Sequence, residues 1–201
     1  MQGYEYTDSK KTEDQHLWIQ IIGGNKDALG KLFDVYSSEL LTYGYRISKN
    51  KTLSSDAVQD VFVDLWLYRQ NLAEQVQVKF YLYRSLRRAV VKQMSQQQIS
   101  YSDISDVEFF TDFEPSPESE WLSRESEKDR NSRILNSLNF LSQREREIIS
   151  LKYYSDLKIR EIAAMLDLKD QTVANTLQNA LTKLRKHLVY LCIAFCTFLN
   201  F

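Results

Sequence analysis

One stretch of the sequence combines cations and aromatic rings at a spacing suited to nucleic acid. Residues 79–92 read KFYLYRSLRRAVVK and carry five basic side chains and no acidic one. Four of the cations recur at i, i+3, i+4 and i+8, which is one face of a helix. The basic residues are Lys79, Arg84, Arg87, Arg88 and Lys92, and the aromatic residues are Phe80, Tyr81 and Tyr83. Cations that hold phosphates beside rings that stack on bases would bind a single or opened strand. The alternative is that the rings are core and the arginines form a solvated face.

A second motif, in residues 157–184, has the spacing of a helix-turn-helix. Ile162, Ala163 and Leu166 share one face of a short helix, and a tight turn follows. The apolar face of the next helix would consist of Val173, Leu177, Ala180, Leu181 and Leu184. Ala163 allows the two helices to cross closely, and Asp167 tolerates the left-handed backbone of the turn. In this motif the second helix enters the major groove and presents its first residues to base edges.

The polar side chains of that second helix suit contact with duplex DNA. Amides can form two hydrogen bonds to adenine, and hydroxyls can contact either base type. The residues expected to face the bases are Gln171, Thr172, Asn175 and Gln178. The cations expected to hold phosphates are Lys169, Lys183, Arg185 and Lys186. The alternative is an ordinary helical hairpin whose polar face is exposed to water.

An acidic stripe indicates a third kind of surface. Asp56, Asp60 and Asp64 recur at i, i+4 and i+8. Like charges at this spacing cost an isolated helix about 0.2–0.5 kcal/mol per pair. Val63 and Leu67 lie beside them and would be exposed in an isolated domain. A plain solvated face explains the aspartates alone, whereas a protein partner with a basic, partly apolar surface explains all five residues.

Helical periodicity predicts the helices that would carry the basic, aromatic segment and the acidic stripe. An apolar segment at residues 17–22 ends at a Gly-Gly pair, after which Asn25 or Asp27 can cap a second helix. A third helix would open at Ser54 or Ser55. A fourth would span residues 78–97, after a break near residues 71–77. We therefore expect a four-helix domain over residues 1–97.

A linker and a second helical domain complete the expected all-α architecture. Residues 98–130 carry 10 acidic and 3 basic side chains together with both prolines of the chain, which disfavours a stable helix. Residues 131–201 hold the second domain, in which Ser142 and Glu145 have capping-box spacing. Its apolar tail, residues 189–201, is too short to span a bilayer and is expected to extend the last helix and pack against protein. Interfacial membrane association is the less favoured alternative because a cationic face is missing.

The composition excludes several classes of protein. Five glycines and two prolines in 201 residues disfavour a many-stranded β fold. Cys192 and Cys196 form neither a disulfide framework nor a zinc pattern, so a reducing cytosol and no metal are expected. The first eleven residues are polar, unlike a signal peptide. Residues 1–97 carry 13 basic and 11 acidic side chains and residues 131–201 carry 10 and 6, and such small surpluses suggest that DNA binding needs a partner.

Taken in their order along the chain, the acidic stripe, the basic helix and the helix-turn-helix resemble the extracytoplasmic-function (ECF) group of the sigma-70 family of RNA polymerase subunits. Residues 55–69, SDAVQDVFVDLWLYR, are similar to region 2.2 of that group. Residues 81–90, YLYRSLRRAV, resemble the start of region 2.4, and residues 138–188 resemble region 4 along their length. The likeness covers residues 15–97 and 131–188, and the pairing of the two regions is more specific than either alone.

The resemblance implies a role for each motif in transcription initiation. Region 2.2 would dock on the clamp coiled coil of core RNA polymerase through Asp56, Gln59, Asp60, Phe62, Asp64 and Trp66. Residues 69–78 would correspond to region 2.3, which captures a flipped base of the −10 element. The −10 DNA would be bound by Lys79, Phe80, Tyr83, Arg84, Arg87 and Arg88. The −35 DNA would be bound by Lys169, Gln171, Thr172, Asn175, Gln178 and Lys183. The acidic linker resembles the connector that is threaded through the RNA path.

The expected function is therefore a sigma factor that directs promoter recognition and opening, without a cofactor. Core RNA polymerase and promoter DNA are the expected partners in the cytoplasm, and an anti-sigma factor is a further candidate. The alternative is another helix-turn-helix regulator whose first domain senses a ligand or dimerises. An enzyme is disfavoured because the chain has no HExxH, CxxC, GxSxG or phosphate-binding glycine loop. A further alternative is an anti-regulator or adaptor, which would lack DNA contacts in both domains.

Overall fold

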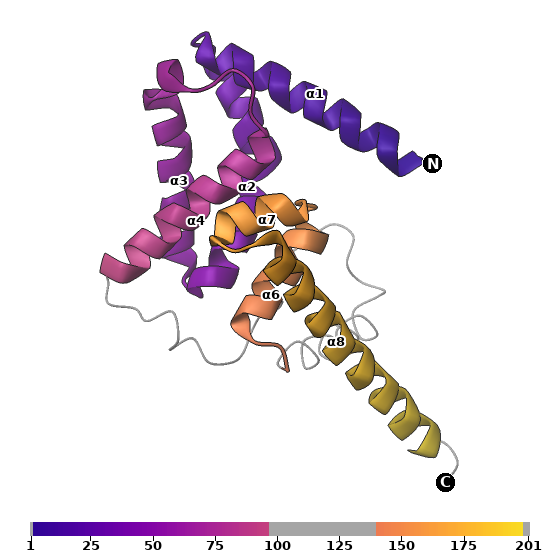
Figure 1. Ribbon diagram of the computed structural model, residues 1–201. Helices are drawn as coiled ribbons and strands as arrows, with labels where there is room; N and C mark the ends of the chain where they lie inside the picture. Colours follow the sequence, from indigo (N-terminus) through magenta and orange to yellow (C-terminus); the bar gives the residue numbers. More distant parts are fainter. Residues whose placement is uncertain (1, 97–139, 199–201) are drawn as a thin grey trace, which may run out of the picture. The chain divides into compact units, whose positions relative to one another are not determined.

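The computed structural model describes the backbone of residues 2–96 and 140–198, and the side chains of residues 10–96 and 140–186. Every regular element in these residues is a helix, which confirms the all-α prediction (Figure 1). The chain divides into two compact units, Met1–Ile104 and Ser105–Phe201, which we describe separately. The predicted linker, residues 98–130, lies outside the described residues.

The first unit consists of four α-helices and one short 3-10 helix. The α-helices are α1 (Gln2–Ile22), α2 (Lys26–Ser48), α3 (Lys51–Leu67) and α4 (Val78–Gln96), and the 3-10 helix η1 is Arg69–Asn71. Both α2 and α4 pack against the three other helices. Residues 72–77 form the loop that leads from η1 into α4. We refer to this segment as the 72–77 loop.

Side-chain caps mark where α2 and α3 begin. Asn25 caps α2, because its side chain accepts hydrogen bonds from the backbone N–H groups of Asp27 and Ala28. The predicted start of the third helix at Ser54 or Ser55 is wrong, because Asn50 caps α3 by accepting from the N–H of Leu53 at 3.0 Å. Ser54 instead lies fully buried within α3, where its hydroxyl bonds that of Ser48 at 2.8 Å. A buried serine thus has the periodicity of a core position and can be mistaken for a cap.

The core of the first unit is rich in aromatic side chains. Its largest fully buried residues are Trp18, Tyr36, Tyr43, Tyr83, Ile21, Leu32, Leu40, Leu65, Leu82 and Leu86. The rings of Tyr43 and Tyr83 pack with their centroids 5.2 Å apart. Burial of apolar side chains is the main driving force for folding, but each buried phenolic O–H or indole N–H then needs a partner inside the protein.

The second unit contains the predicted helix-turn-helix. Its elements are α6 (Gln143–Ile149), the π-helical turn η2 (Ser150–Tyr154), α7 (Ile159–Leu166) and α8 (Asp170–Phe198). The predicted capping box of α6 is present, with Ser142 and Glu145 each bonding the other's backbone N–H. The turn between α7 and α8 passes through Asp167, whose φ of 54° is left-handed as expected.

The backbone of α8 continues as a helix to Phe198, as expected for the apolar tail. Its side chains from residue 187 onward lie outside the described residues, so the packing of the tail stays a prediction. Within the part of the chain that is described, no helix is long and apolar enough to cross a membrane.

Candidate nucleic-acid and protein-docking surfaces

The basic face of α4 is only partly available to a ligand. Arg88 and Lys92 are exposed, and Arg84 is half-buried. The guanidinium of Arg84 lies 5.9 Å from the centre of the Phe80 ring, within the range of a cation–π contact. Its Nε atom is buried and has no hydrogen-bond acceptor among the described residues. Arg84 and Phe80 thus form one unit of ring and cation at the surface of α4.

Two other cations of this segment already have partners in the fold. The Nζ atom of Lys79 lies 3.1 Å from a carboxylate oxygen of Glu39, and its side chain is only 27% exposed. It also lies 5.9 Å from the ring of Tyr83. Arg87 is half-buried and also takes part in an interaction with another group. Both residues would have to exchange a partner in the protein for a phosphate. This exchange reduces the net free energy gained on binding DNA.

Tyr83 is not a residue on which a base can stack. It is 2% exposed, and its ring packs against Tyr43 in the core. Its hydroxyl donates a hydrogen bond to Glu39 at 3.3 Å. We therefore correct its predicted assignment to the −10 set, because the alternative that this ring belongs to the core is the one observed.

The acidic stripe of α3 is exposed, as expected. We define the acidic face of α3 by six exposed residues, Asp56, Gln59, Asp60, Val63, Asp64 and Leu67. Val63 is 54% and Leu67 is 62% exposed, which is high for aliphatic side chains beside three carboxylates. Apolar surface left in water is unfavourable, so this combination suits a surface that another protein covers.

Two residues predicted on the same surface have different environments. Phe62 is 5% exposed and packs edge to face against Phe33 with the ring centroids 5.0 Å apart. It belongs to the core, so its predicted contact with polymerase is corrected. Trp66 is half-buried, with the cations of Arg69 and Lys26 at 4.2 and 5.9 Å from its ring. This ring can contact a partner only along its remaining exposed part.

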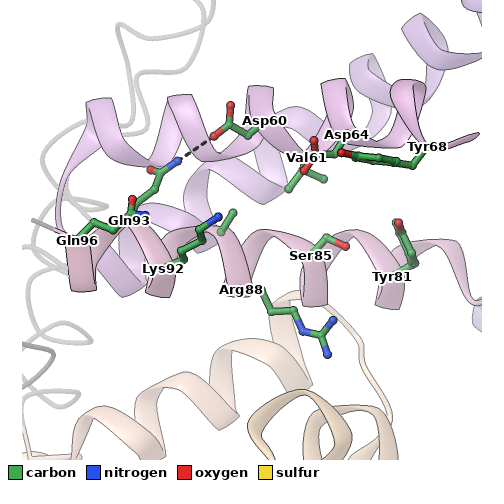
Figure 2. A pocket seen from close by; sticks show the side chains of 11 residues that line it. Asp60, Val61, Asp64, Tyr68, Tyr81, Ser85, Arg88, Lys92, Gln93 and Gln96 are labelled. Atoms are coloured by element: carbon green, nitrogen blue, oxygen red, sulfur yellow. Dashed lines mark hydrogen bonds between the residues drawn. The ribbon is translucent and has the colours of Figure 1, made fainter.

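A groove separates the acidic face of α3 from the basic face of α4. It has a volume of about 630 Å³, and Figure 2 shows side chains of both helices along it. Asp60 and Asp64 line one side, and Arg88 and Lys92 line the other. Gln93 spans it by donating a hydrogen bond to Asp60 at 3.0 Å. The two surfaces predicted separately from the sequence therefore share an edge.

A second hollow lies at the 72–77 loop and was not predicted. It has a volume of about 510 Å³ and is lined by Gln15 and Ile19 of α1 together with residues 74–77. No periodic signal could have identified it, because its walls come from two segments more than fifty residues apart. The packing of α1 against α4 and η1 brings them together.

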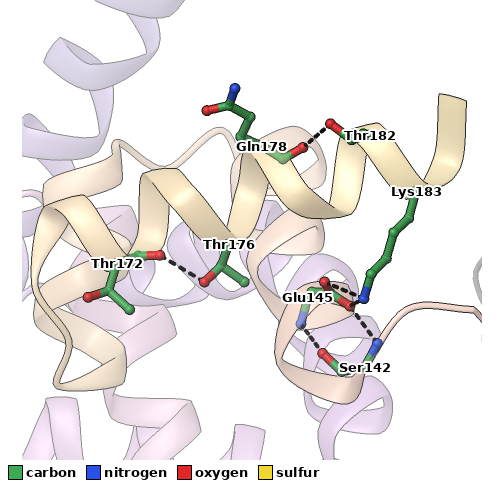
Figure 3. Close-up of polar contacts among 7 residues, drawn as sticks. All are labelled: Ser142, Glu145, Thr172, Thr176, Gln178, Thr182 and Lys183. Carbon is green, nitrogen blue, oxygen red and sulfur yellow. Dashed lines mark hydrogen bonds and ion pairs between the residues drawn. The ribbon is translucent and has the colours of Figure 1, made fainter.

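The first turns of α8 present the predicted base-reading residues to solvent. Gln171, Thr172, Asn175 and Gln178 are exposed, while Val173, Leu177 and Ala180 are buried on the opposite side. Gln171 donates a hydrogen bond to the side chain of Asn175 at 3.0 Å. Thr176 and Thr182 instead donate to backbone carbonyls, at Thr172 and Gln178 respectively (Figure 3). The two amides thus hold each other in place before any base is bound.

Lys183 has a structural role that the sequence did not indicate. Its Nζ atom lies 2.8 and 2.9 Å from the two carboxylate oxygens of Glu145, whose side chain is 8% exposed (Figure 3). Burial by itself would raise the pKa of Glu145, but the hydrogen bonds from Lys183 and Ser142 outweigh it and hold the pKa below its usual range. We therefore propose that Lys183 stabilises the fold and does not bind phosphate. Lys169, Arg185 and Lys186 remain exposed.

A buried carboxylate also occurs in the first unit. Asp14 is 7% exposed and accepts a hydrogen bond from the hydroxyl of Tyr36, which is fully buried. Burial raises the pKa of Asp14, and the bond from Tyr36 offsets this only in part. Burial and the neighbouring carboxylate both raise the pKa of the Tyr36 hydroxyl. This pair joins α1 to α2.

Comparisons with known proteins agree with both units. Residues 32–99 match the family model described as Sigma-70 region 2, and residues 132–184 match the one described as Sigma-70, region 4. The chain is 22% identical over 178 residues to the ECF RNA polymerase sigma factor SigW of Bacillus subtilis (strain 168), covering 84% of this chain and 93% of that protein.

Two solved structures share the fold. One is CnrH in complex with the cytosolic domain of CnrY, with a TM-score of 0.61 and 21% identity over 89% of this chain and 98% of the other. The second is the sigma factor RpoE in complex with the anti-sigma factor NepR from Bartonella quintana, with a TM-score of 0.57 and 21% identity over 82% and 98%.

Proposed function

This chain belongs to the ECF group of the sigma-70 family and is a transcription initiation factor, and we propose which of its surfaces perform each step. In this proposal the acidic face of α3 docks on core RNA polymerase. The basic face of α4 and the 72–77 loop bind the opened −10 strand. The exposed side of α8 reads the −35 duplex.

The docking assignment is supported by charge and exposure together. Asp56, Asp60 and Asp64 repel one another along α3, and Val63 and Leu67 are left in water beside them. A basic, partly apolar helical surface would neutralise the carboxylates and cover the aliphatic side chains in one contact. Such complementarity raises association rates and disfavours partners of the wrong charge.

The opened strand is assigned to Arg84, Arg88 and Phe80, with the hollow at the 72–77 loop beside α1. Two cations can hold phosphates, and the ring offers a stacking surface. The hollow can receive a base that has left the duplex, and an unpaired base costs less to place there than a paired one. A surface that binds the melted strand better than the duplex favours opening without any covalent chemistry.

The −35 duplex is assigned to Gln171, Thr172, Asn175 and Gln178, with Lys169 holding a phosphate. The first turns of the second helix are the part of a helix-turn-helix that reaches base edges. The amides of Gln171 and Asn175 are each suited to adenine. Their mutual hydrogen bond reduces the side-chain entropy that binding must remove.

An anti-sigma factor is a further proposed partner. The two similar solved structures are complexes, one with the cytosolic domain of CnrY and one with the anti-sigma factor NepR. The exposed aliphatic residues of α3 offer such a protein a binding surface. An anti-sigma factor bound there would compete with polymerase for the same face of α3. Since the proposed partners are core polymerase and the chromosome, the proposed site of action is the cytoplasm.

The observation that carries the proposal is the acidic face of α3. A docking surface for core polymerase there would explain why DNA binding by this chain needs a partner. The experiment reconstitutes the chain with core RNA polymerase, maps transcription start sites and compares the sequences upstream. We expect a shared pair of −10 and −35 sequences. The double variant Asp60→Lys with Asp64→Lys should weaken polymerase binding at least about 100-fold, since like charges across an interface cost several kcal/mol.

A matched control keeps the same change of charge away from α3. Glu13→Lys with Asp34→Lys alters two exposed acids, one on α1 and one on α2, and should leave polymerase binding within about twofold. If the unaltered chain binds duplex DNA tightly and shows no affinity for polymerase, it acts instead as another kind of helix-turn-helix regulator.

A further inference from the structure

No side chain of the 72–77 loop is fully buried. The side chains of Ala73, Glu74, Gln75 and Gln77 are exposed, and those of Leu72 and Val76 are half-buried. Holding a backbone in one conformation costs about 1–2 kcal/mol of entropy per residue at room temperature. A loop that must present a defined hollow to a base therefore needs support from elsewhere in the fold.

Helix α1 provides that support through two adjacent backbone carbonyls of the loop. The indole Nε1–H of Trp18 donates a hydrogen bond to the carbonyl of Ala73 at 3.0 Å. The side-chain amide of Gln15 donates to the carbonyl of Glu74. Gln15 and Trp18 are three residues apart, so they lie on the same face of α1. The loop is thus held from a helix that precedes it by more than fifty residues.

Trp18 is itself fixed in position. It is fully buried, and its ring packs edge to face against Tyr81 in the first turn of α4, with the centroids 4.9 Å apart. A buried indole N–H needs an acceptor, and the acceptor here is a loop carbonyl. One side chain therefore links α1, the 72–77 loop and the beginning of the basic helix α4.

Ile19 gives the hollow an apolar wall. It is 51% exposed on α1, and it lines the hollow together with Gln15, Gln75 and Gln77. A nucleobase has an apolar face and a polar edge, so an aliphatic side chain beside amide groups fits both. The exposed half of Ile19 is therefore available for contact with a base.

We propose that α1 is a working part of the strand-capture site. Gln15 and Trp18 are positioning residues that hold the 72–77 loop in its base-accepting shape, and Ile19 contacts the captured base and contributes to the preference at that one position. This inference rests on the proposed function, because it assumes that the loop receives an unpaired base.

The test uses the full chain bound to core polymerase. The probe is a fork-junction DNA whose single-stranded part carries the sequence that the unaltered holoenzyme selects from a random pool. Trp18→Phe keeps an aromatic ring and removes the donor, and Gln15→Ala removes the second donor from a partly exposed position. We expect each variant to bind the probe about three- to tenfold more weakly. Polymerase affinity should be unchanged.

Ile19→Ala provides a readout that a purely structural role would not change. When the random pool is selected again with this variant, we expect the preference to relax at a single base position and to persist at all others. An unchanged preference at every position would overturn the role of Ile19. Relaxation at many positions would overturn it as well, because it would indicate a general loss of the site.

A matched control separates loop positioning from the general packing of α1. Tyr36→Phe removes the hydrogen bond to Asp14 and so weakens the contact of α1 with α2 without touching the loop. We expect this variant to lose thermal stability but to retain probe binding within about twofold once folded. If Tyr36→Phe weakens probe binding as much as Trp18→Phe does, the positioning role is wrong.

The loop itself provides the last comparison. Gln75→Ala with Gln77→Ala should weaken probe binding if the hollow receives a base at all. If this pair has an effect while Gln15→Ala, Trp18→Phe and Ile19→Ala have none, the inference about α1 fails and the proposed function stands. If the loop pair has no effect either, the proposed capture site itself is wrong.

Discussion

The two helices proposed to bind DNA, α4 and α8, use their surfaces very differently. Gln171, Thr172 and Asn175 of α8 are all exposed, as the periodicity predicts. In the corresponding set of α4, Lys79 is paired with Glu39 and Tyr83 is in the core. The cause is the number of neighbours, because α4 packs against three helices and the described part of α8 packs against α6 and α7. The sequence of a helix predicts which of its polar side chains are exposed only when that helix has a single buried side.

The first prediction contrasts Arg84 and Arg88 of α4 with Lys79, whose ammonium group is paired with Glu39. Arg84→Ala with Arg88→Ala should reduce open-complex formation about 30- to 100-fold, since charge-assisted hydrogen bonds to phosphates are lost. Polymerase binding should be intact, as measured by titration of labelled core enzyme. Lys79→Ala should reduce opening only about two- to threefold, because the pair with Glu39 already occupies this cation. Collapse of polymerase binding in the arginine variant would show that the basic face of α4 is misassigned.

The second prediction applies the same test to α8, where the residues of the predicted set are exposed. Asn175→Ala should weaken binding of the holoenzyme to the −35 duplex by about tenfold and relax selection at one base pair, because two hydrogen bonds to one base are removed. Binding to the single-stranded −10 probe should not change. Equal effects on both probes would mean that the two units do not divide the promoter between them.

The third prediction concerns Lys183, which we propose to stabilise the fold and not to bind phosphate. Lys183→Ala should lower the free energy of unfolding of the second unit by about 1 kcal/mol, because the buried carboxylate of Glu145 loses a partner that is itself half-exposed. The salt dependence of −35 binding should not change. Lys169→Ala is the counterpart, and it should leave stability unchanged while lowering the salt slope by about 1. A lower slope in Lys183→Ala would return this residue to the phosphate-binding set.

The fourth prediction compares the buried carboxylates of the two units, which should respond to pH in opposite directions. The pKa of Asp14 is raised, so its contribution to stability is present below the ordinary aspartate pKa of about 3.9 and is lost as pH rises through the raised value. The pKa of Glu145 is lowered, so its contribution is present above about 4.3 and is lost as pH falls through the lowered value.

Amide hydrogen exchange resolved by unit would measure this contrast. Relative to the unaltered chain, Asp14→Asn should improve in stability between pH 4 and about pH 7. Glu145→Gln should become relatively worse over a lower range, as pH rises through the lowered pKa of Glu145 to about 4.3, and should change little above it. Parallel responses of the two variants would show that at least one carboxylate is not held as described.

The local order of the chain was accessible from the sequence because it depends on nearby residues. The left-handed turn at Asp167, the capping box of Ser142 and Glu145 and the cap at Asn25 all involve groups within a few positions of each other. Short-range hydrogen bonds of this kind leave a signature in residue type and spacing. Ser54 shows the limit of prediction from local residue type and spacing. A serine inside a helix and a serine that caps one cannot be distinguished until the group that bonds the hydroxyl is known.

The sequence by itself therefore determined the helices, the helix-turn-helix and the exposed acidic face of α3. Only the tertiary structure decided which polar and aromatic residues remain available to a ligand. Lys79 forms an ion pair with Glu39, and Lys183 forms one with Glu145. The rings of Tyr83 and Phe62 are buried in the core. The hollow beside Ile19 likewise needs α1 and the 72–77 loop to meet. These contacts join residues at least 29 positions apart, and helical periodicity carries no information over such a distance because it describes one helix at a time.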